Sequence, residues 1–529
     1  MNMKRAVPYK NIYSNDTTNI STCISPYHKT RGVRFDKDVI RATVAEVAGQ
    51  VDAHFIQLAH GQVPWYKSRI YPMDEHLRWW KEYFEVTDEQ IASLKELCGY
   101  VRDGGDILAD FTSACRDYGQ APFVSIRLND VHHIENYNVK GHTKGIHSIS
   151  KFLVDNLDLL MGDDVSVWEN RALNWADPRP AERMLALITE QCENYDIDGF
   201  ELDYLRIDNF FKQNETTSEE RCGIMRKFIS EVRAVLDRTA RDGRYRYLSV
   251  RVPSDLGVWD ELGLSPDVLI SSGVDIANVS SHFYADQWVD RERIVNLLPG
   301  IAVYFEVCHC THRGINLAAA SSKYDNFTYR RVTPSEIYTT ADLTYSAGGR
   351  GLSYFNFAYY REHGTPPEMR GPFNEPPFYA IGNARDETFV AEAPKHFYIA
   401  RGWARNSQLH RRFDVGEEHS LVIYAIAPKD DFADRFRLRV TADGPLGDAV
   451  IRVSVNGVSA DPCDDISEPY DEDNAYPPLH ATEHETKAFL FPSNAVRDGE
   501  NIIRFNISSN EKEDFGFYYV DMFPDPKRR

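Results

Sequence analysis

The chain has 529 residues and a formal net charge of −20 at pH 7, with 60 Lys and Arg against 80 Asp and Glu. This charge balance argues against a nucleic-acid-binding surface, which needs clustered basic side chains. No segment approaches the 18 consecutive apolar residues of a membrane-spanning helix. We therefore expect neither nucleic acid nor a membrane as a partner, and the length predicts two or more domains.

The eight cysteines are too sparse for a disulfide scaffold, so we expect them to be reduced. The first 20 residues contain no apolar run of the kind found in secretory signals. A cytoplasmic location is expected unless a leader has been removed. The segment Cys308–His312 contains C-x-C, but no second ligand pair stands at a spacing that completes a zinc site. We expect no metal and no other cofactor.

Strand-like segments alternate with helical patterns over the first two thirds of the chain. The strand-like segments are Ile20–Ser25, His54–Ala59, Phe123–Leu128, Gly199–Leu205, Tyr247–Val252, Ile276–Phe283, Ile301–Val307 and Gly351–Phe357. The helical patterns are Asp38–Ala48, Asp103–Tyr118, Ala181–Tyr195, Ser218–Thr239, Asp290–Leu298 and Pro334–Ala347. Such alternation predicts parallel βαβ units, and eight of them predict a closed (β/α)8 TIM barrel of the α/β class over residues 1–388.

The character of the sequence changes in its last third, where only short alternating segments occur. They are Ser420–Ala427, Phe436–Thr441, Ala449–Asn456, Glu485–Phe491, Asn501–Ser508 and Gly516–Met522. The dipeptides Asn456-Gly457 and Asp498-Gly499 are turn signals between them. The pattern predicts an all-β, jelly-roll-like sandwich domain over residues 389–529. Its strands show no row of exposed aromatic residues, so we expect this domain to support the barrel.

The segment Gly199–Ile207 carries the clearest functional signal. Apolar and polar residues alternate in it, so Glu201 and Asp203 leave the same face of a strand, about 7 Å apart. Buried unpaired charges are costly, and two of them on one strand face do not stabilise a core. Acids at the carboxyl end of a barrel strand are instead typical of catalytic groups.

Other polar and aromatic residues follow the predicted strands in the same way, and we expect them to bind substrate at the carboxyl end of the barrel. They are His28, His60, Trp65, Arg127, Asn129, His132, Trp175, Arg206, Arg251, His282, Tyr284, Trp288 and Asn356. Cleavage of a glycosidic bond needs two carboxyl groups on opposite sides of that bond. The fourth and seventh strands lie across a barrel from each other, so Asp203 or Glu201 would face Glu306 over a sugar.

The motif around these acids resembles known glycosidase barrels. Asn174–Pro178, followed after a helix by Asp198–Asp203, is similar to barrels of the glycosyl hydrolase-like 10 type. Asp198–Asp203 also resembles the α-amylase strand DGFRxD, which implies that Asp203 is the nucleophile. Acids on the fourth and seventh strands are similar to a large retaining-glycosidase clan, which implies that Asp203 is the acid/base and Glu306 the nucleophile. We favour the second assignment, because Glu306 stands on an otherwise apolar strand, although Glu201-Leu-Asp203 replaces the clan's Asn-Glu pair.

The resemblance implies a retaining glycoside hydrolase acting on an oligosaccharide or polysaccharide, with the carbohydrate as its partner. Two other hypotheses stay open. The first is a metal-dependent sugar isomerase or epimerase that uses Glu201, Asp203, His282 and Glu306 as ligands. The second is a non-catalytic carbohydrate-binding barrel, in which the acids and arginines form a structural ion network. The appended β-sandwich favours the hydrolase, because such domains are typical of enzymes that act on polymers.

Overall fold

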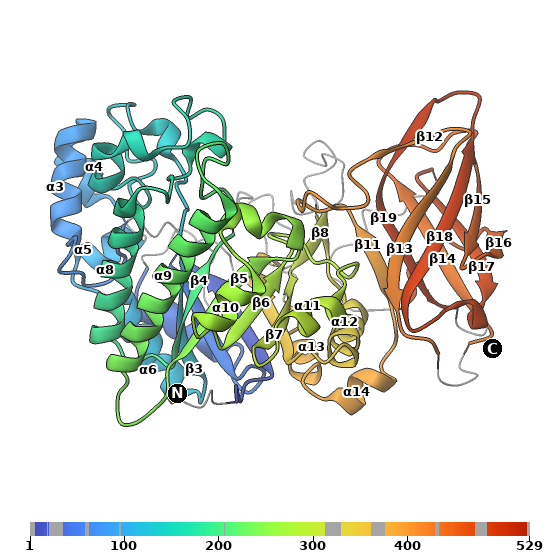
Figure 1. The fold of residues 1–529 in the computed structure, drawn as a ribbon, viewed down its shortest axis with the longest axis horizontal. Helices are drawn as coiled ribbons and strands as arrows, with labels where there is room; N and C mark the ends of the chain where they lie inside the picture. The colour runs from blue at the N-terminus through green and yellow to red at the C-terminus, as the bar shows by residue number, and fades with distance from the viewer. Residues whose placement is uncertain are drawn as a thin grey trace. The chain divides into compact units, whose positions relative to one another are not determined.

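The computed structural model describes residues 6–17, 20, 35–58, 63–94, 97–205, 207–312, 329–360, 376–428, 433–470 and 484–525. Eight strands form a closed barrel in the order β1-β10-β7-β6-β5-β4-β3-β2, and nine strands form a separate antiparallel sheet (Figure 1). The predicted fold class, a (β/α)8 barrel followed by an all-β sandwich, is confirmed.

The barrel strands match the prediction except at the start. They are β1 Asn11–Asp16, β2 Ala53–Leu58, β3 Ala121–Arg127, β4 Gly199–Asp203, β5 Tyr247–Pro253, β6 Ile276–Ser280, β7 Ala302–Cys308 and β10 Gly351–Phe355. The predicted first strand is wrong, since β1 precedes it, and Ile20–Ser25 lies outside the described residues except for Ile20. The cause is the polarity of β1, whose alternate side chains Ser14 and Asp16 hide it from a search for apolar runs.

Helices follow most of the barrel strands, and Figure 1 shows α6, α8 and α9 along the outside of β3, β4 and β5. Their bounds are α2 Lys37–Ala45, α3 Met73–Phe84, α4 Asp88–Ala92, α5 Leu97–Arg102, α6 Ile107–Asp117, α7 Lys151–Asp155, α8 Pro178–Asn194, α9 Ser218–Arg238, α10 Pro266–Ser271, α11 Arg291–Leu297, α12 Pro334–Ser346, α13 Phe378–Asn383 and α14 Glu387–Glu392. Helix α9 begins with a capping box, in which Thr217 and Glu220 bond to each other's backbone N–H.

The amino-terminal end of the barrel is filled by apolar side chains. One buried cluster includes Ile12, Phe55, Phe123, Tyr247 and Tyr304. The rings of Phe55 and Phe123 stack with their centroids 4.3 Å apart. This apolar layer is the usual filling of a barrel of this kind, and the polar residues described below replace it toward the other end.

Gly199 is the residue of β4 that lies against this apolar layer. A Cβ added there would collide with the ring of Phe123 and would lie 2.6 Å from the Tyr247 carbonyl oxygen. We expect Gly199→Ala to lower the free energy of unfolding by about 3 kcal/mol, because a backbone carbonyl cannot move aside cheaply.

The matched control is Gly223→Ala in α9, where an added Cβ meets nothing within 4 Å. This change should raise the free energy of unfolding by about 0.5–1 kcal/mol, since alanine is the better helix former. Urea unfolding measures both changes. Equal effects of the two substitutions would contradict the packing described for Gly199.

The chain forms two compact units. One comprises Met1–Ser280 with Leu297–Tyr304, and the other comprises Ser281–Asn296 with Phe305–Arg529. The predicted boundary between residues 388 and 389 is a different division and stays a prediction. Both units are described below by themselves.

The antiparallel sheet lies in the second unit and wraps one apolar core. Its strand order is β11-β19-β14-β17-β16-β15-β18-β13, with β12 paired to β19. The bounds are β11 Phe397–Ala400, β12 Arg412–Asp414, β13 Glu418–Ala425, β14 Arg435–Ala442, β15 Val450–Val455, β16 Val458–Cys463, β17 Thr486–Pro492, β18 Gly499–Ser508 and β19 Asp514–Pro524. The predicted turn at Asn456-Gly457 is confirmed: both residues have positive φ and join β15 to β16. Three short strands, β11, β12 and β16, were not predicted. A further pair, β8 Cys310–His312 and β9 Tyr329–Arg331, forms a two-stranded sheet.

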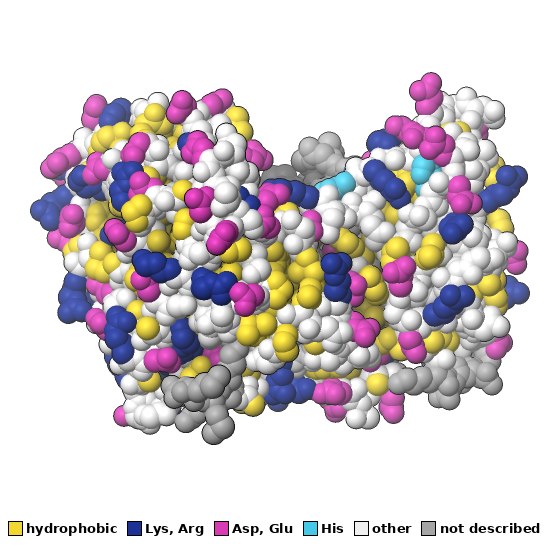
Figure 2. All heavy atoms as spheres, in the orientation of Figure 1, with side chains coloured by type: hydrophobic (Ala, Val, Ile, Leu, Met, Phe, Trp, Pro, Cys, Tyr) yellow, Lys and Arg dark blue, Asp and Glu magenta, His cyan; other side chains and the backbone are white. Residues whose placement is uncertain are grey.

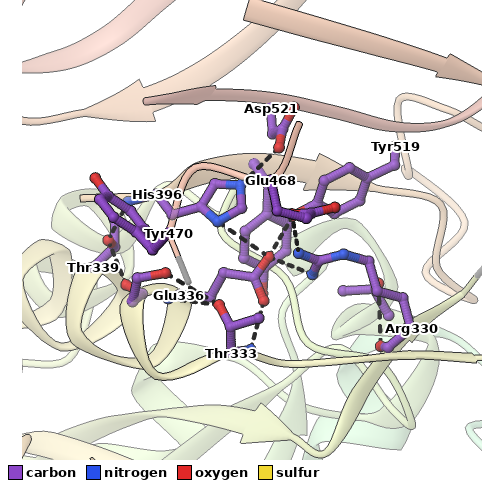
Figure 3. A network of polar contacts seen from close by, with 12 residues as sticks. Arg330, Thr333, Glu336, Thr339, His396, Glu468, Tyr470, Tyr519 and Asp521 are labelled. Atoms are coloured by element: carbon purple, nitrogen blue, oxygen red, sulfur yellow. Dashed lines mark hydrogen bonds and ion pairs between the residues drawn. The ribbon is translucent and has the colours of Figure 1, made fainter. Parts of the chain in front are cut away.

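A buried ionic network joins α12 to this sheet (Figure 3). Arg439 on β14 binds both carboxylate oxygens of Asp521 on β19, at 2.6 and 3.1 Å, and His396 Nε2 lies 2.7 Å from Asp521 Oδ2. Glu336 on α12 accepts hydrogen bonds from Arg330 and from the Tyr519 hydroxyl. Opposite charges thus compensate one another inside the unit, which is the condition for burying them.

The surface carries charges of both signs. On the face shown in Figure 2, Lys and Arg side chains are interspersed with Asp and Glu and form no continuous basic patch among the described residues. Among the residues that the structure describes, no helix combines the length and apolar character needed to cross a bilayer.

Candidate functional site

The carboxyl end of the barrel strands in the first unit is occupied by charged side chains. Arg127, Asp203 and Arg251 stand in direct register on β3, β4 and β5. Arg251 Nη1 lies 3.1 Å from each carboxylate oxygen of Asp203, and Arg127 Nε lies 4.0 Å from Oδ2. The Gln57 amide and the backbone N–H of Leu205 also donate hydrogen bonds to this carboxylate. Asp203 is fully buried, and these donors surround its carboxylate group.

Arg127 links Asp203 to two further acids. Its guanidinium lies 2.6 Å from Asp16 Oδ2 on β1 and 2.8 Å from Asp130 Oδ2 in the loop after β3, and it donates to Gln57 Oε1 at 2.6 Å. Burial lowers the pKa of Arg127, but the surrounding carboxylates outweigh burial and raise the pKa above its ordinary value.

Glu201 lies one pleat deeper on β4, in a layer of neutral partners. Its carboxyl group accepts hydrogen bonds from Ser125 at 2.8 Å, Ser249 at 2.9 Å and Asn278 at 3.3 Å. Burial, and then the charge of Asp203, raise the pKa of Glu201 to about 7. The hydrogen bonds of Glu201 thus go to neutral side chains, and it is Asp203 that binds the guanidinium of Arg251.

The raised pKa of Glu201 has a consequence for stability. An ordinary glutamate has a pKa near 4.5 in the unfolded chain, so the folded state binds the proton more tightly. The free energy of unfolding should therefore fall as the pH rises from about 4.5 to about 7, by on the order of 3 kcal/mol from this one group.

Glu201→Gln is expected to remove this contribution while keeping a side chain of the same shape. The measurement is the free energy of urea unfolding of wild type and variant at pH 5 and pH 7. The variant should gain stability relative to wild type over that interval. If the difference in free energy of unfolding between the two proteins does not change with pH, the raised pKa of Glu201 is contradicted.

A cluster of this kind costs stability that the fold does not require. Barrels of this type are normally filled by branched apolar side chains, and removing charges from water carries a penalty of several kcal/mol per ion. Acid, guanidinium and amide groups nevertheless occupy the carboxyl ends of β1 to β5 (Asp16, Gln57, Arg127, Asp203 and Arg251). Their position is the one where barrel enzymes carry their reacting groups.

Several residues that were predicted to bind substrate make contacts with the protein's own side chains and backbone. Trp65 is buried and donates its N–H to the His147 carbonyl oxygen. Trp175 is fully buried between the rings of Phe210 and Phe228, so neither of its faces is open to a sugar.

Asn129 and Trp288 have comparable surroundings. The Asn129 side chain closes a loop by bonding to the backbone of Leu173 and Asn209. Trp288 packs against the core of the antiparallel sheet. The contacts of these two side chains are therefore with the protein itself.

His132, by contrast, keeps partial exposure beside the charged cluster. Its Nδ1 binds Asp130, the acid that pairs with Arg127, and its ring meets Trp168 edge to face at 5.0 Å. The predicted residues His28, His60 and Arg206 lie outside the described residues.

The second unit supplies the remaining predicted residues. Glu306 on β7 is buried, and it follows Tyr304 by two residues, so it leaves the same face of that strand. His282 lies shortly after the end of β6, and Asn356 directly follows β10. Their φ angles are +67° and +59°, respectively. Left-handed backbone at residues other than glycine is uncommon and concentrates at functional sites. Tyr284 is buried beside Phe283.

Sequence reasoning missed three polar members of the cluster, namely Asp16, Gln57 and Ser280. The Ser280 hydroxyl accepts a hydrogen bond of 3.0 Å from Arg251 Nη2. Asp16 was missed because β1 was misplaced. Gln57 could have been found, because a polar side chain on an apolar strand that faces the barrel interior is the same signal that identified Asp203.

No group of three or more metal-binding side chains occurs among the residues described. At the C-x-C segment, Cys308 Sγ lies 3.3 Å from His309 Nδ1. Within the described part of the chain, the cysteines at 115, 192, 222, 310 and 463 form no disulfide.

Comparison with known proteins gives structural neighbours only. No protein-family model matches the sequence, and no curated protein sequence matches it. Among solved structures, a maltogenic α-amylase from Thermotoga neapolitana is 10% identical, with 99% of this chain and 100% of that chain covered and a TM-score of 0.37. The PgaB glycoside hydrolase domain from Bordetella bronchiseptica is 9% identical, with 72% and 99% covered and a TM-score of 0.40. An α-L-fucosidase from Paenibacillus thiaminolyticus is 11% identical, with 94% and 97% covered and a TM-score of 0.35. These structural neighbours are glycoside hydrolases.

Proposed function

We propose that this chain hydrolyses glycosidic bonds with retention of configuration and that Asp203 is the nucleophile. The observation that carries the proposal is the buried Asp203 carboxylate at the carboxyl end of β4, held as an anion by Arg251 and Arg127. A buried ion pair gives the barrel little advantage over apolar packing, whereas a nucleophile must be anionic and fixed in orientation.

The contacts of Asp203 bear on which of the two roles it takes. Donors hold both carboxylate oxygens of Asp203 in one orientation, which suits a group that attacks from a fixed position. The contacts therefore support the α-amylase-like assignment, in which Asp203 attacks, over the one preferred from the sequence, in which it donates a proton.

In the proposed reaction an Asp203 oxygen forms a bond to the anomeric carbon while the bond to the leaving oxygen breaks. A second carboxyl group gives its proton to that oxygen and later takes one from the water that cleaves the glycosyl ester. Glu306, the acid of β7, is our candidate for this second group. Arg251 keeps the unreacted Asp203 oxygen in place throughout.

The test uses two series of aryl glycosides that differ in leaving group. Glu306→Gln should lose most of its kcat/KM on 4-nitrophenyl glycosides, whose leaving group benefits from a proton, and should keep it on 2,4-dinitrophenyl glycosides, which leave unaided. The comparison uses kcat/KM because it reports the first step, whereas loss of the base in the second step lowers kcat on both series. A wild-type protein that cleaves neither series, nor plant, algal or microbial polysaccharides, would overturn the proposed function. An equal loss on both series would remove Glu306 from the acid role.

A further inference from the structure

Trp403 is an exposed tryptophan supported from beneath by other aromatic rings. It lies in the loop after β11, and 51% of its surface is accessible to solvent. Its ring stacks on Phe283 with centroids 5.5 Å apart and planes 25° apart, and Tyr284 meets it edge to face at 5.1 Å. Phe283 covers one face of the indole, so the accessible area belongs largely to the other face.

The rings beneath Trp403 belong to loops that follow barrel strands. Phe283 and Tyr284 come shortly after β6, and His309, whose ring is 5.0 Å from that of Phe283, comes directly after β7. A hydrogen bond of 2.8 Å from the Ala285 N–H to the Cys310 carbonyl ties the two loops together. Loops after parallel barrel strands form the face on which such enzymes bind substrate.

The loop that carries Trp403 is held by its own hydrogen bonds. The Arg401 guanidinium donates to the carbonyl oxygens of Leu409 and Phe517, at 3.1 and 2.8 Å. The Gly402 N–H donates to the Ser407 hydroxyl at 3.3 Å. The indole is therefore fixed before any ligand arrives, and a binding group fixed in advance loses little entropy on binding.

What distinguishes Trp403 from other exposed hydrophobic residues is that its ring is stacked on another aromatic ring and lies beside loops that follow barrel strands. The apolar C–H face of a pyranose ring fits a flat aromatic surface of this size, and its hydroxyl groups stay in water. A protein partner would need a larger apolar patch. The two described rings that contact Trp403, those of Phe283 and Tyr284, are themselves buried.

We propose that Trp403 is a sugar-stacking platform for one ring of a bound glycan, in a subsite next to the loops after β6 and β7. The ligand class rests on the proposed glycosidase function. The platform assigns a binding role to a residue of the β11–β12 connection, in the part of the chain that the sequence predicts to act only as support.

The experiment measures binding of cellohexaose, maltohexaose, xylohexaose and chitohexaose by isothermal titration calorimetry, with product analysis to correct for turnover. Trp403→Ala should weaken the binding of at least one hexasaccharide by about tenfold or more, and Trp403→Phe should restore part of the loss, because a smaller ring still stacks. The matched control is Phe389→Ala on α14, another exposed aromatic that rests on a neighbouring ring, that of Tyr338. It should leave binding unchanged.

The two claims fail in different ways. Binding that Trp403→Ala does not weaken, or no binding of any hexasaccharide by wild type, overturns the platform. If wild type binds in a Trp403-dependent way but cleaves no aryl glycoside or glycan, the platform stands and the proposed hydrolase fails. If wild type cleaves aryl monosaccharides but its binding of hexasaccharides does not depend on Trp403, the proposed hydrolase stands and the platform fails.

Discussion

Asp203→Asn is expected to lower kcat on aryl glycosides by at least about 10³-fold, because the amide cannot attack the anomeric carbon. The side chain keeps its size, and Gln57 and Arg251 remain beside it. The measurement is kcat on the substrate that wild type cleaves best, with the folded fraction determined by circular dichroism.

Asp198→Asn provides the control for Asp203→Asn. Asp198 precedes the same strand at its other end and is also paired with an arginine, since Arg116 lies 2.6 Å from it. It should leave kcat unchanged. If Asp203 were only part of a structural ion network, Asp203→Asn would lose stability while the molecules that fold kept full kcat, and that outcome would contradict a nucleophilic role.

Asp521→Asn is expected to lower the free energy of unfolding of the unit that contains α12 and the antiparallel sheet by about 3–5 kcal/mol. The change leaves the guanidinium of Arg439, which is almost fully buried, without its carboxylate, and an uncompensated buried charge is far more costly than the pair. Although burial alone raises it, Arg439 and His396 hold the pKa of Asp521 below its ordinary value (Figure 3).

The control is Asp514→Asn on β19, whose partner Arg412 is exposed. It should change the free energy of unfolding far less than Asp521→Asn does, because an exposed ion pair contributes little to stability. Urea unfolding followed by tryptophan fluorescence measures both. A similar small effect of the two changes would show that Asp521 does not compensate Arg439.

The fold could be predicted because its main elements carry local periodic signals. Strands such as β4 and β7 show alternation, and helices such as α8 and α9 show an apolar stripe with clear caps. The first barrel strand could not be found in this way, since the barrel closes around Asp16 and Ser14 rather than around apolar residues. Short strands such as β11 and β16 gain their stability from neighbours that lie far away in the sequence.

The candidate site was predicted only in part. Strand alternation identifies Asp203 and Glu201, because both lie on one strand, and the register then brings Arg127 and Arg251 beside Asp203. Alternation cannot say that Trp175 is enclosed by Phe210 and Phe228, since that depends on how helices pack. For the same reason the platform at Trp403 is invisible in the sequence: its supporting ring, Phe283, belongs to a distant loop.

The account depends on Asp203 forming a covalent bond to the sugar. The most direct measurement incubates the protein with a panel of 2,4-dinitrophenyl 2-deoxy-2-fluoroglycosides, which form the glycosyl ester and break it down slowly, followed by peptide mass spectrometry. The account predicts a fluoroglycosyl group on the peptide that contains Asp203 and its absence from the Asp203→Asn variant. A label on Glu306, or turnover of an aryl glycoside with inversion of configuration, would contradict it.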